Sequence, residues 1–150
     1  MKISFLDSIE LFMWEGYVMT VEEILDEFLN CVNKFDRVVI KSSSKNPNRR
    51  NVYVGSAKKR WMQIDIRETN VNICMDHNHG DLSEEDVLIT GVPNKRTRGK
   101  SGFDFKIDSK NFDAVHFTFY ESDPFDFGRK EFLDFLDKHY KSYLRLVKFR

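Results

Sequence analysis

The chain has 150 residues, of which 41% are hydrophobic and 32% charged, and these values fit one folded domain spanning residues 1–150. They exclude an intrinsically disordered chain and a bundle of membrane-spanning helices. The 24 lysines and arginines equal the 24 aspartates and glutamates, so no overall field attracts nucleic acid or anionic lipid. Fourteen phenylalanines predict an aromatic core.

The N-terminal stretch is apolar but is interrupted by Asp7, Glu10 and Glu15, and no small-residue cleavage site follows it. It is therefore expected to be neither a signal peptide nor a membrane helix. Cys31 and Cys74 are too few for a disulfide framework and are typical of reduced thiols. We therefore expect a cytoplasmic protein that does not contact membranes.

Two helices are predicted at the N-terminus. Asp7 can cap a short helix that ends at Gly16. Thr20 and Glu23 have the spacing of a capping box, and apolar residues then recur at the helical period as far as Val32.

From residue 38 the hydrophobic period changes to two, which predicts a run of strands. The expected strands are 38–40, 52–54, 61–67, 71–75, 103–107 and 115–119, with a further short strand at 87–91. The composition of 42–51 and 93–102 predicts loops, and 76–86 is expected to be a loop or one helical turn.

A long C-terminal helix is indicated by an apolar stripe from Phe132 to Val147, and Ser122, Asp123 and Pro124 form a helix-start signal before it. Helices, then strands, then a helix indicate an α+β fold. We expect a mainly antiparallel, curved sheet of five to six strands, with two N-terminal helices and one long C-terminal helix.

The densest polar cluster comprises Cys74, Asp76, His77, His79 and Asp81. Such residues can bind zinc or a harder divalent metal. The segment Asp76-His77-Asn78-His79 also resembles HNH-type nucleases, in which a histidine activates water, a metal steadies the phosphate and a later asparagine, here Asn94, orients the site. However, no CxxC pair is present, and 95–102 is a poor helix where that family needs one. We interpret the segment as a solvated hairpin loop and keep the metal-dependent nuclease as the alternative.

No nucleophile motif or phosphate-binding loop occurs: GxSxG and GxxxxGK[ST] are both missing from the sequence. We interpret His116 and His139 as structural histidines. A non-enzymatic protein without a cofactor is therefore favoured.

The charges are unevenly distributed. Eight basic residues and one acid, Asp65, lie between residues 41 and 67, so eight minus one leaves a local charge of +7; loop 92–101 adds four basic residues and no acid. If folding brings these segments together, one face can bind phosphates. The predicted nucleic-acid contacts are Arg49, Arg50, Lys58, Lys59, Arg60, Lys95, Arg96 and Arg98, with Tyr53 and Trp61 stacking on bases. The alternative is that Trp61 belongs to the core and the lysines are ordinary loop charges.

Several segments between residues 50 and 140 resemble a small uncharacterised bacterial domain labelled a predicted transport protein, found alone or attached to restriction-type nucleases. They are KKRWMQIDI, TNVNICMD, EDVLITG, SGFDFKIDSKNFDAV and EFLDFLDKHY. The strand order is also similar to the double-wing DNA-binding domain of a phage transcription activator. Residues 77–86 and 120–128 depart from both patterns. The resemblance implies a sheet backed by helices, no established catalysis, and a link to nucleic acid or phage–host conflict.

Our leading hypothesis is a binding module for nucleic acid or a nucleic-acid-handling protein, acting as a phage regulator or anti-defence inhibitor. A third hypothesis, beside the nuclease, is an inhibitor whose acidic surface mimics nucleic acid; its residues would be Glu22, Glu23, Asp26, Glu27, Glu84, Glu85 and Asp86. Exposed edge strands could pair between two copies of the chain, so a homodimer is a further alternative.

Overall fold

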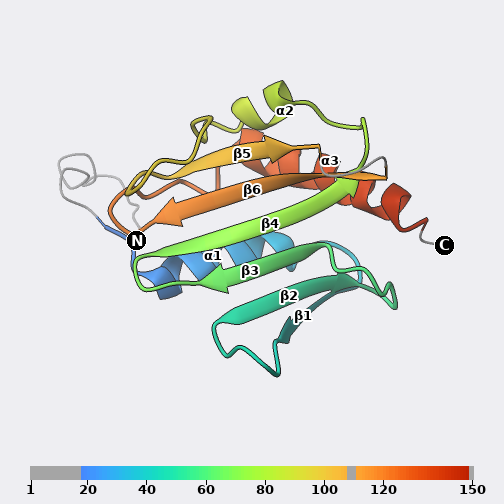
Figure 1. Cartoon of the computed structure of the whole chain (residues 1–150), viewed down its shortest axis with the longest axis horizontal. Coiled ribbons are helices and arrows are strands. Elements are labelled where there is room, and N and C mark those ends of the chain that lie inside the picture. Colours follow the sequence, from blue (N-terminus) through green and yellow to red (C-terminus); the bar gives the residue numbers. More distant parts are fainter. Residues whose placement is uncertain (1–17, 108–110, 149–150) are drawn as a thin grey trace.

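The computed structural model describes residues 18–107 and 111–148, which form a six-stranded antiparallel sheet and three helices (Figure 1). The strand order is β1-β2-β3-β4-β6-β5. The elements are α1 (Val21–Val32), β1 (Val38–Ser42), β2 (Arg49–Val54), β3 (Met62–Ile66), β4 (Asn70–Asn78), α2 (Glu84–Leu88), β5 (Gly102–Lys106), β6 (Phe112–Tyr120) and α3 (Lys130–Leu146). The predicted α+β class is confirmed, and the short helix expected at 7–16 lies outside the described residues.

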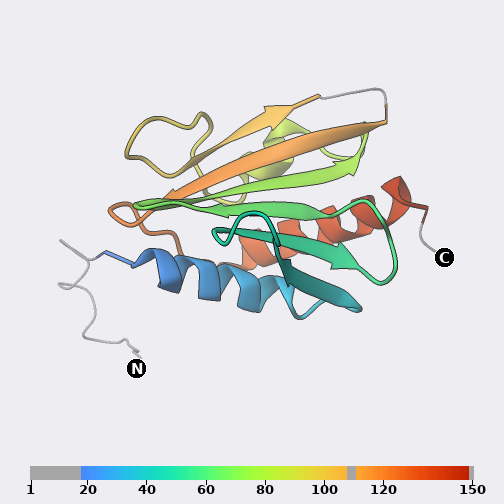
Figure 2. The same ribbon diagram turned by 60° about the horizontal axis from the view of Figure 1, so that its bottom comes forward.

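The structure has two layers, because α1 and α3 both lie on one side of the sheet (Figure 2). We call this side the helix face and the opposite side the open face. The short α2 lies next to β5, and an ion pair of 2.8 Å between Asp86 and Lys138 joins it to α3. No helix in the described part of the chain is long and apolar enough to cross a membrane.

Helix α1 begins where the capping box predicts. The Thr20 hydroxyl accepts a hydrogen bond from the Glu23 amide, and the Glu23 carboxylate accepts one from the Thr20 amide. Both bonds satisfy amides that have no partner within the helix. The buried residues Val21, Ile24 and Phe28 recur at the helical period and turn this helix toward the sheet.

An aromatic core fills the space between the layers. Phe117 of β6 packs edge-on against Phe132 and Phe135 of α3, and Phe28 of α1 contacts Phe132. All four rings are buried. Large apolar side chains of this kind provide most of the stabilisation of a small domain, so the core holds both helices on the same face.

Four local predictions were wrong. Residues 49–51, expected to lie in a loop, form the first half of β2, because they pair with β3. Residues 87–91 are not a strand, since they form the end of α2 and the turn after it. Strand β4 runs on to Asn78 because β6 pairs with it to the end, Asn78 lying opposite Phe112. Pro124 does not start α3, which begins at Lys130; Asp123 instead accepts hydrogen bonds from the backbone amide and the hydroxyl of Ser101.

Candidate functional site

The open face is lined by polar side chains, because alternate residues of each strand point away from the helices. On β4, Val71, Ile73 and Met75 are buried on the helix face, while their neighbours are only partly buried on the open face. Strand register aligns these neighbours into a row across five strands. The row consists of Asn51, Gln63, Cys74, His116 and Asp104.

The basic loop 92–101 is fixed along the outer edge of β5. Phe103 donates a hydrogen bond of 2.9 Å to the Pro93 carbonyl, and its own carbonyl accepts one of 2.7 Å from Lys95. A side chain on Gly102 would place its Cβ 2.7 Å from the carbonyl oxygen of Lys95, so only glycine permits this approach. The loop thereby brings Arg96 over the open face, where it bonds Asp104 at 2.6 Å and Thr118 at 3.3 Å.

Two adjoining hollows of about 350 and 280 Å³ lie on the open face and share Arg67, Asn72 and Arg96. We call them together the arginine hollow. The other charged residues that line it are Arg60, Arg98, Asp65 and Asp104. Arg60 and Arg67 come from the first basic segment, and Arg96 and Arg98 come from the second, so folding brings the two segments together.

Both carboxylates of the arginine hollow are engaged by arginines. Asp65 is bound by Arg49 at 2.7 Å, and Asp104 is bound by Arg96. Partial burial raises the pKa of Asp104, but the hydrogen bond and charge of Arg96 outweigh it and hold that pKa below its usual value. Arg60, Arg67 and Arg98 are exposed and form no ion pair within residues 18–107 and 111–148. These three cations are therefore the ones that can meet an anionic ligand.

Four other residues predicted to contact nucleic acid lie outside the arginine hollow. Tyr53 lies on the open face of β2 with the Lys41 ammonium 5.2 Å from its ring centre, and Lys58 lines the same small hollow. Lys59 is bound to Asp76 at 3.0 Å and lies over the Phe112 ring. Lys95 is exposed but does not line the arginine hollow.

Arg50 and Trp61 do not lie on the open face, contrary to prediction. Arg50 is opposite Ile64 in register and so lies toward the helix face, where its guanidinium donates to the Pro47 carbonyl at 2.9 Å. Trp61 is fully buried, stacks on Tyr143 of α3, and donates from its indole to Nδ1 of His139 at 2.9 Å. Its ring therefore cannot stack on a base at the surface.

Asp76 and His77 point to opposite faces of β4, so the segment expected to hold a metal is divided by the sheet. Asp76 binds Lys59 on the open face, and His77 is fully buried on the helix face. His79 is exposed, and its Nδ1 lies 2.8 Å from Asp113. No group of three or more histidine, cysteine or acidic side chains suited to a metal occurs among the described residues. The amide of Asn94 donates to Glu84 at 3.3 Å.

A buried chain of hydrogen bonds sets the tautomers of two histidines. The indole of Trp61 can only donate, so His139 accepts at Nδ1 and carries its proton on Nε2. That Nε2 lies 3.1 Å from Nδ1 of His77, which therefore accepts and keeps its own proton on Nε2. Protonated Nε2 cannot ligate a metal. Burial lowers the pKa of His77, and burial together with the neighbouring charge of His77 holds the pKa of His139 well below its usual value.

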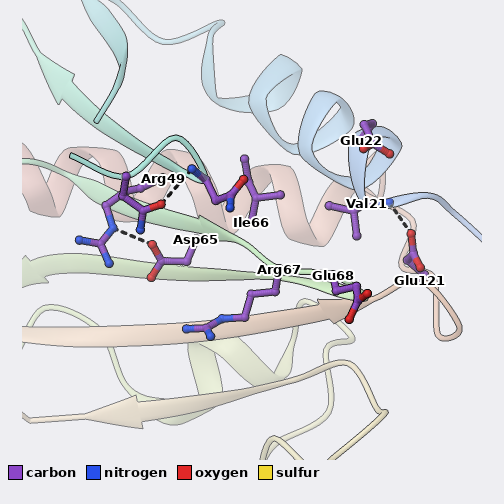
Figure 3. Close-up of a pocket in the computed structure, with 10 residues that line it drawn as sticks. Val21, Glu22, Arg49, Asp65, Ile66, Arg67, Glu68 and Glu121 are labelled. Atoms are coloured by element: carbon purple, nitrogen blue, oxygen red, sulfur yellow. Dashed lines mark hydrogen bonds and ion pairs between the residues drawn. The ribbon is translucent and has the colours of Figure 1, made fainter. Parts of the chain in front are cut away.

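A larger hollow, of about 700 Å³, lies beside the arginine hollow at the start of α1 (Figure 3). Figure 3 shows Arg49 and Arg67 at one end with Asp65, and Glu22 and Glu121 at the other. Glu68 also lines it, so two arginines face four carboxylates in this hollow. Because its charge is mixed, it fits a polyanion less well than the arginine hollow does.

Several residues that line the arginine hollow were not predicted as nucleic-acid contacts, among them Arg67, Gln63, Asn72, Cys74, His116 and Tyr120. The period-two alternation of their strands was a signal for their common face, although not for their proximity. Comparison with known proteins found no matching family model, no matching curated protein and no matching solved structure.

Proposed function

We propose that the protein is a non-enzymatic binding module that holds single-stranded nucleic acid on its open face. The observation that supports this is the arginine hollow, whose two halves bring arginines of two distant segments onto one face: Arg60 and Arg67 from the first, Arg98 from the second. Guanidinium groups form charge-assisted hydrogen bonds with phosphate oxygens. A neutral protein can bind a polyanion when its cations gather on one face in this way.

The groups around the arginine hollow suit bases as well as phosphates. The amide side chains of Gln63 and Asn72 line it and can donate to and accept from base edges. Tyr120 also lines it, and Tyr53 lies farther along the same face. Both rings are partly exposed and take the stacking role predicted for Trp61. Aromatic rings can stack on bases only where these are unpaired, which favours a single strand.

Reduced thiols suit the cytoplasm, and we propose that compartment as the place of action. The nuclease alternative needs a metal site, and no group of metal-binding side chains occurs in the described part of the chain. The Nδ1 of His77 is also engaged by His139 and is not available to a metal. The open face therefore supports binding of nucleic acid better than metal-dependent cleavage.

The test is binding of a fluorescently labelled single-stranded oligonucleotide, followed by anisotropy at about 50 and about 200 mM salt. We expect affinity to fall steeply with salt and the duplex of the same sequence to bind more weakly. The double variant Arg60→Ala/Arg67→Ala should lose about tenfold in affinity. Each phosphate contact on a single strand contributes about 0.7 to the slope of log affinity against log salt, so the loss of two contacts should lower that slope by about 1.4.

The matched control is Lys130→Ala/Lys141→Ala, which removes the same charge from the exposed surface of α3 on the helix side. Its affinity should stay close to that of the unmodified protein. Equal losses in the two double variants, or an affinity that does not change with salt, would contradict the proposal.

A further inference from the structure

A thiol and an imidazole meet at the centre of the open face. Cys74 of β4 and His116 of β6 are register partners, and the Cys74 Sγ lies 3.2 Å from the His116 Nε2. Both side chains are partly buried, and both line the smaller half of the arginine hollow. A ligand in the hollow therefore lies against this pair.

The geometry suits an activated thiol. A thiolate is the nucleophilic form of cysteine, and an imidazole within hydrogen-bond distance can accept the thiol proton. Arg60, Arg67 and Arg96 line the same hollow and favour the resulting negative charge. The Cys74 thiol also donates a long hydrogen bond of 3.9 Å to one oxygen of Asp76, whose other oxygen is bound by the Lys59 ammonium. Asp65 lines the same hollow, and its carboxylate is bound by Arg49.

Cys31 provides an internal comparison because it is also a partly buried cysteine. Its Sγ donates to the carbonyl of Phe127 at 3.5 Å. Burial raises the pKa of this thiol above its usual value. The charge of Lys34 lowers the Cys31 pKa, but burial raises it by more, whereas three arginines line the hollow around Cys74.

We propose that Cys74 is a site of thiol–disulfide exchange with small anionic disulfides. His116 takes the thiol proton, and the thiolate attacks one sulfur of the disulfide. A bond forms between Cys74 Sγ and that sulfur, the original disulfide bond breaks, and the other half leaves as a thiolate with the electron pair. Cys74 is thereby oxidised, and the departing half of the reagent is reduced. Carboxylates of the attached half then lie among the arginines of the hollow.

A regulatory consequence rests on the proposed function. The attached anionic group would fill the arginine hollow and neutralise part of its charge. Nucleic acid would then compete for the same guanidinium groups, so the mixed disulfide would lower its affinity. Reduction of the disulfide would restore binding.

The experiment treats the full chain with glutathione disulfide, which is anionic, and with 2-hydroxyethyl disulfide, which is neutral. Peptide mass spectrometry then measures the rate of adduct formation at each cysteine separately. We expect glutathione disulfide to react about tenfold faster at Cys74 than at Cys31. This ratio needs no variant, so it does not depend on the folding of one. Equal rates at the two cysteines would overturn the proposal.

Two variants separate the contributions. His116→Gln should slow the reaction at Cys74 about tenfold, leave Cys31 unchanged, and shift the pH dependence of the Cys74 rate upward. Arg67→Ala should slow the anionic reagent more than the neutral one. An unchanged Cys74 rate in His116→Gln would count against the assigned base.

Nucleic-acid binding is measured separately on the protein before and after adduct formation. If the adduct forms at Cys74 but neither form binds the oligonucleotide, the proposed function fails while the exchange site stands. If the oligonucleotide binds but Cys74 shows no preference over Cys31, the exchange site fails alone.

Discussion

The two faces of the sheet are built from the same strands but have opposite environments. On the helix face, the polar atoms of Trp61 and His139 bond each other inside an aromatic core. On the open face, Cys74 and His116 lie in a hollow lined by arginines. Burial keeps the histidines of the helix face neutral, whereas the open face keeps its titratable pair within reach of solutes. The covering layer, more than the residue type, decides whether a histidine is structural or reactive.

The largest difference between the two faces should appear in the free energy of unfolding when a side chain is truncated on each face. The two positions compared are Trp61, directly before β3, and Gln63 within β3. Trp61→Ala removes a fully buried ring and leaves His139 without its donor. We expect the free energy of unfolding to fall by about 3–5 kcal/mol, measured by urea denaturation.

The matched change on the open face is Gln63→Ala, which removes a partly buried amide bonded to Asp65 at 3.1 Å. Its cost should stay below about 1 kcal/mol. Similar losses from Trp61→Ala and Gln63→Ala would show that the open face is as tightly packed as the helix face.

As pH falls, the stability of the fold should first decrease through the two buried histidines of the helix face. The pKa values of His77 and His139 are lowered in the folded protein, so the unfolded chain binds more protons as pH falls below the usual histidine value of about 6.5. Folding stability then decreases with falling pH, approaching about 1.4 kcal/mol per pH unit for each histidine kept neutral. Urea denaturation between about pH 7.5 and about pH 5.5 measures this slope.

The control for this effect is His139→Gln, which should flatten the slope in that range even if it lowers stability overall. The depressed pKa values of Asp81, Asp86 and Asp104 act in a more acidic range, because their contribution is lost only as pH falls below about 4. A stability that stays constant down to about pH 5.5 would contradict the neutral histidine pair.

A smaller effect should follow from moving the basic loop off the sheet. Gly102→Ala forces its Cβ against the Lys95 carbonyl oxygen, a backbone atom that can give way only if the loop shifts. We expect a loss of about 1–2 kcal/mol in the free energy of unfolding, with a weaker bond between Arg96 and Asp104.

Gly128→Ala is the matched control, because the nearest atom is the flexible Asp126 carboxylate at 3.3 Å. Its stability should change by no more than about 0.5 kcal/mol. If Gly102→Ala were equally harmless, the loop would not be held by this close approach.

Local patterns in the sequence were sufficient for the class and for most elements. The capping box of Thr20 and Glu23 and the alternation along β3 and β4 depend on residues close in the chain, so they could be read without the fold. The helix start predicted at Pro124 was wrong because the Asp123 carboxylate accepts a hydrogen bond from the Ser101 amide instead of capping a helix. No local pattern contains this contact.

The proposed binding surface was decided by tertiary structure. Arg67 and Arg96 come together through strand order and through the loop at Gly102, and Cys74 meets His116 only because β4 pairs with β6. Trp61 is buried directly beside Met62, so simple alternation does not hold there and the ring turns into the core. The sequence by itself determined the elements, because hydrophobic period and capping act over a few residues. Register, strand order and the covering layer depend on contacts between distant residues, and these decided which side chains share a surface.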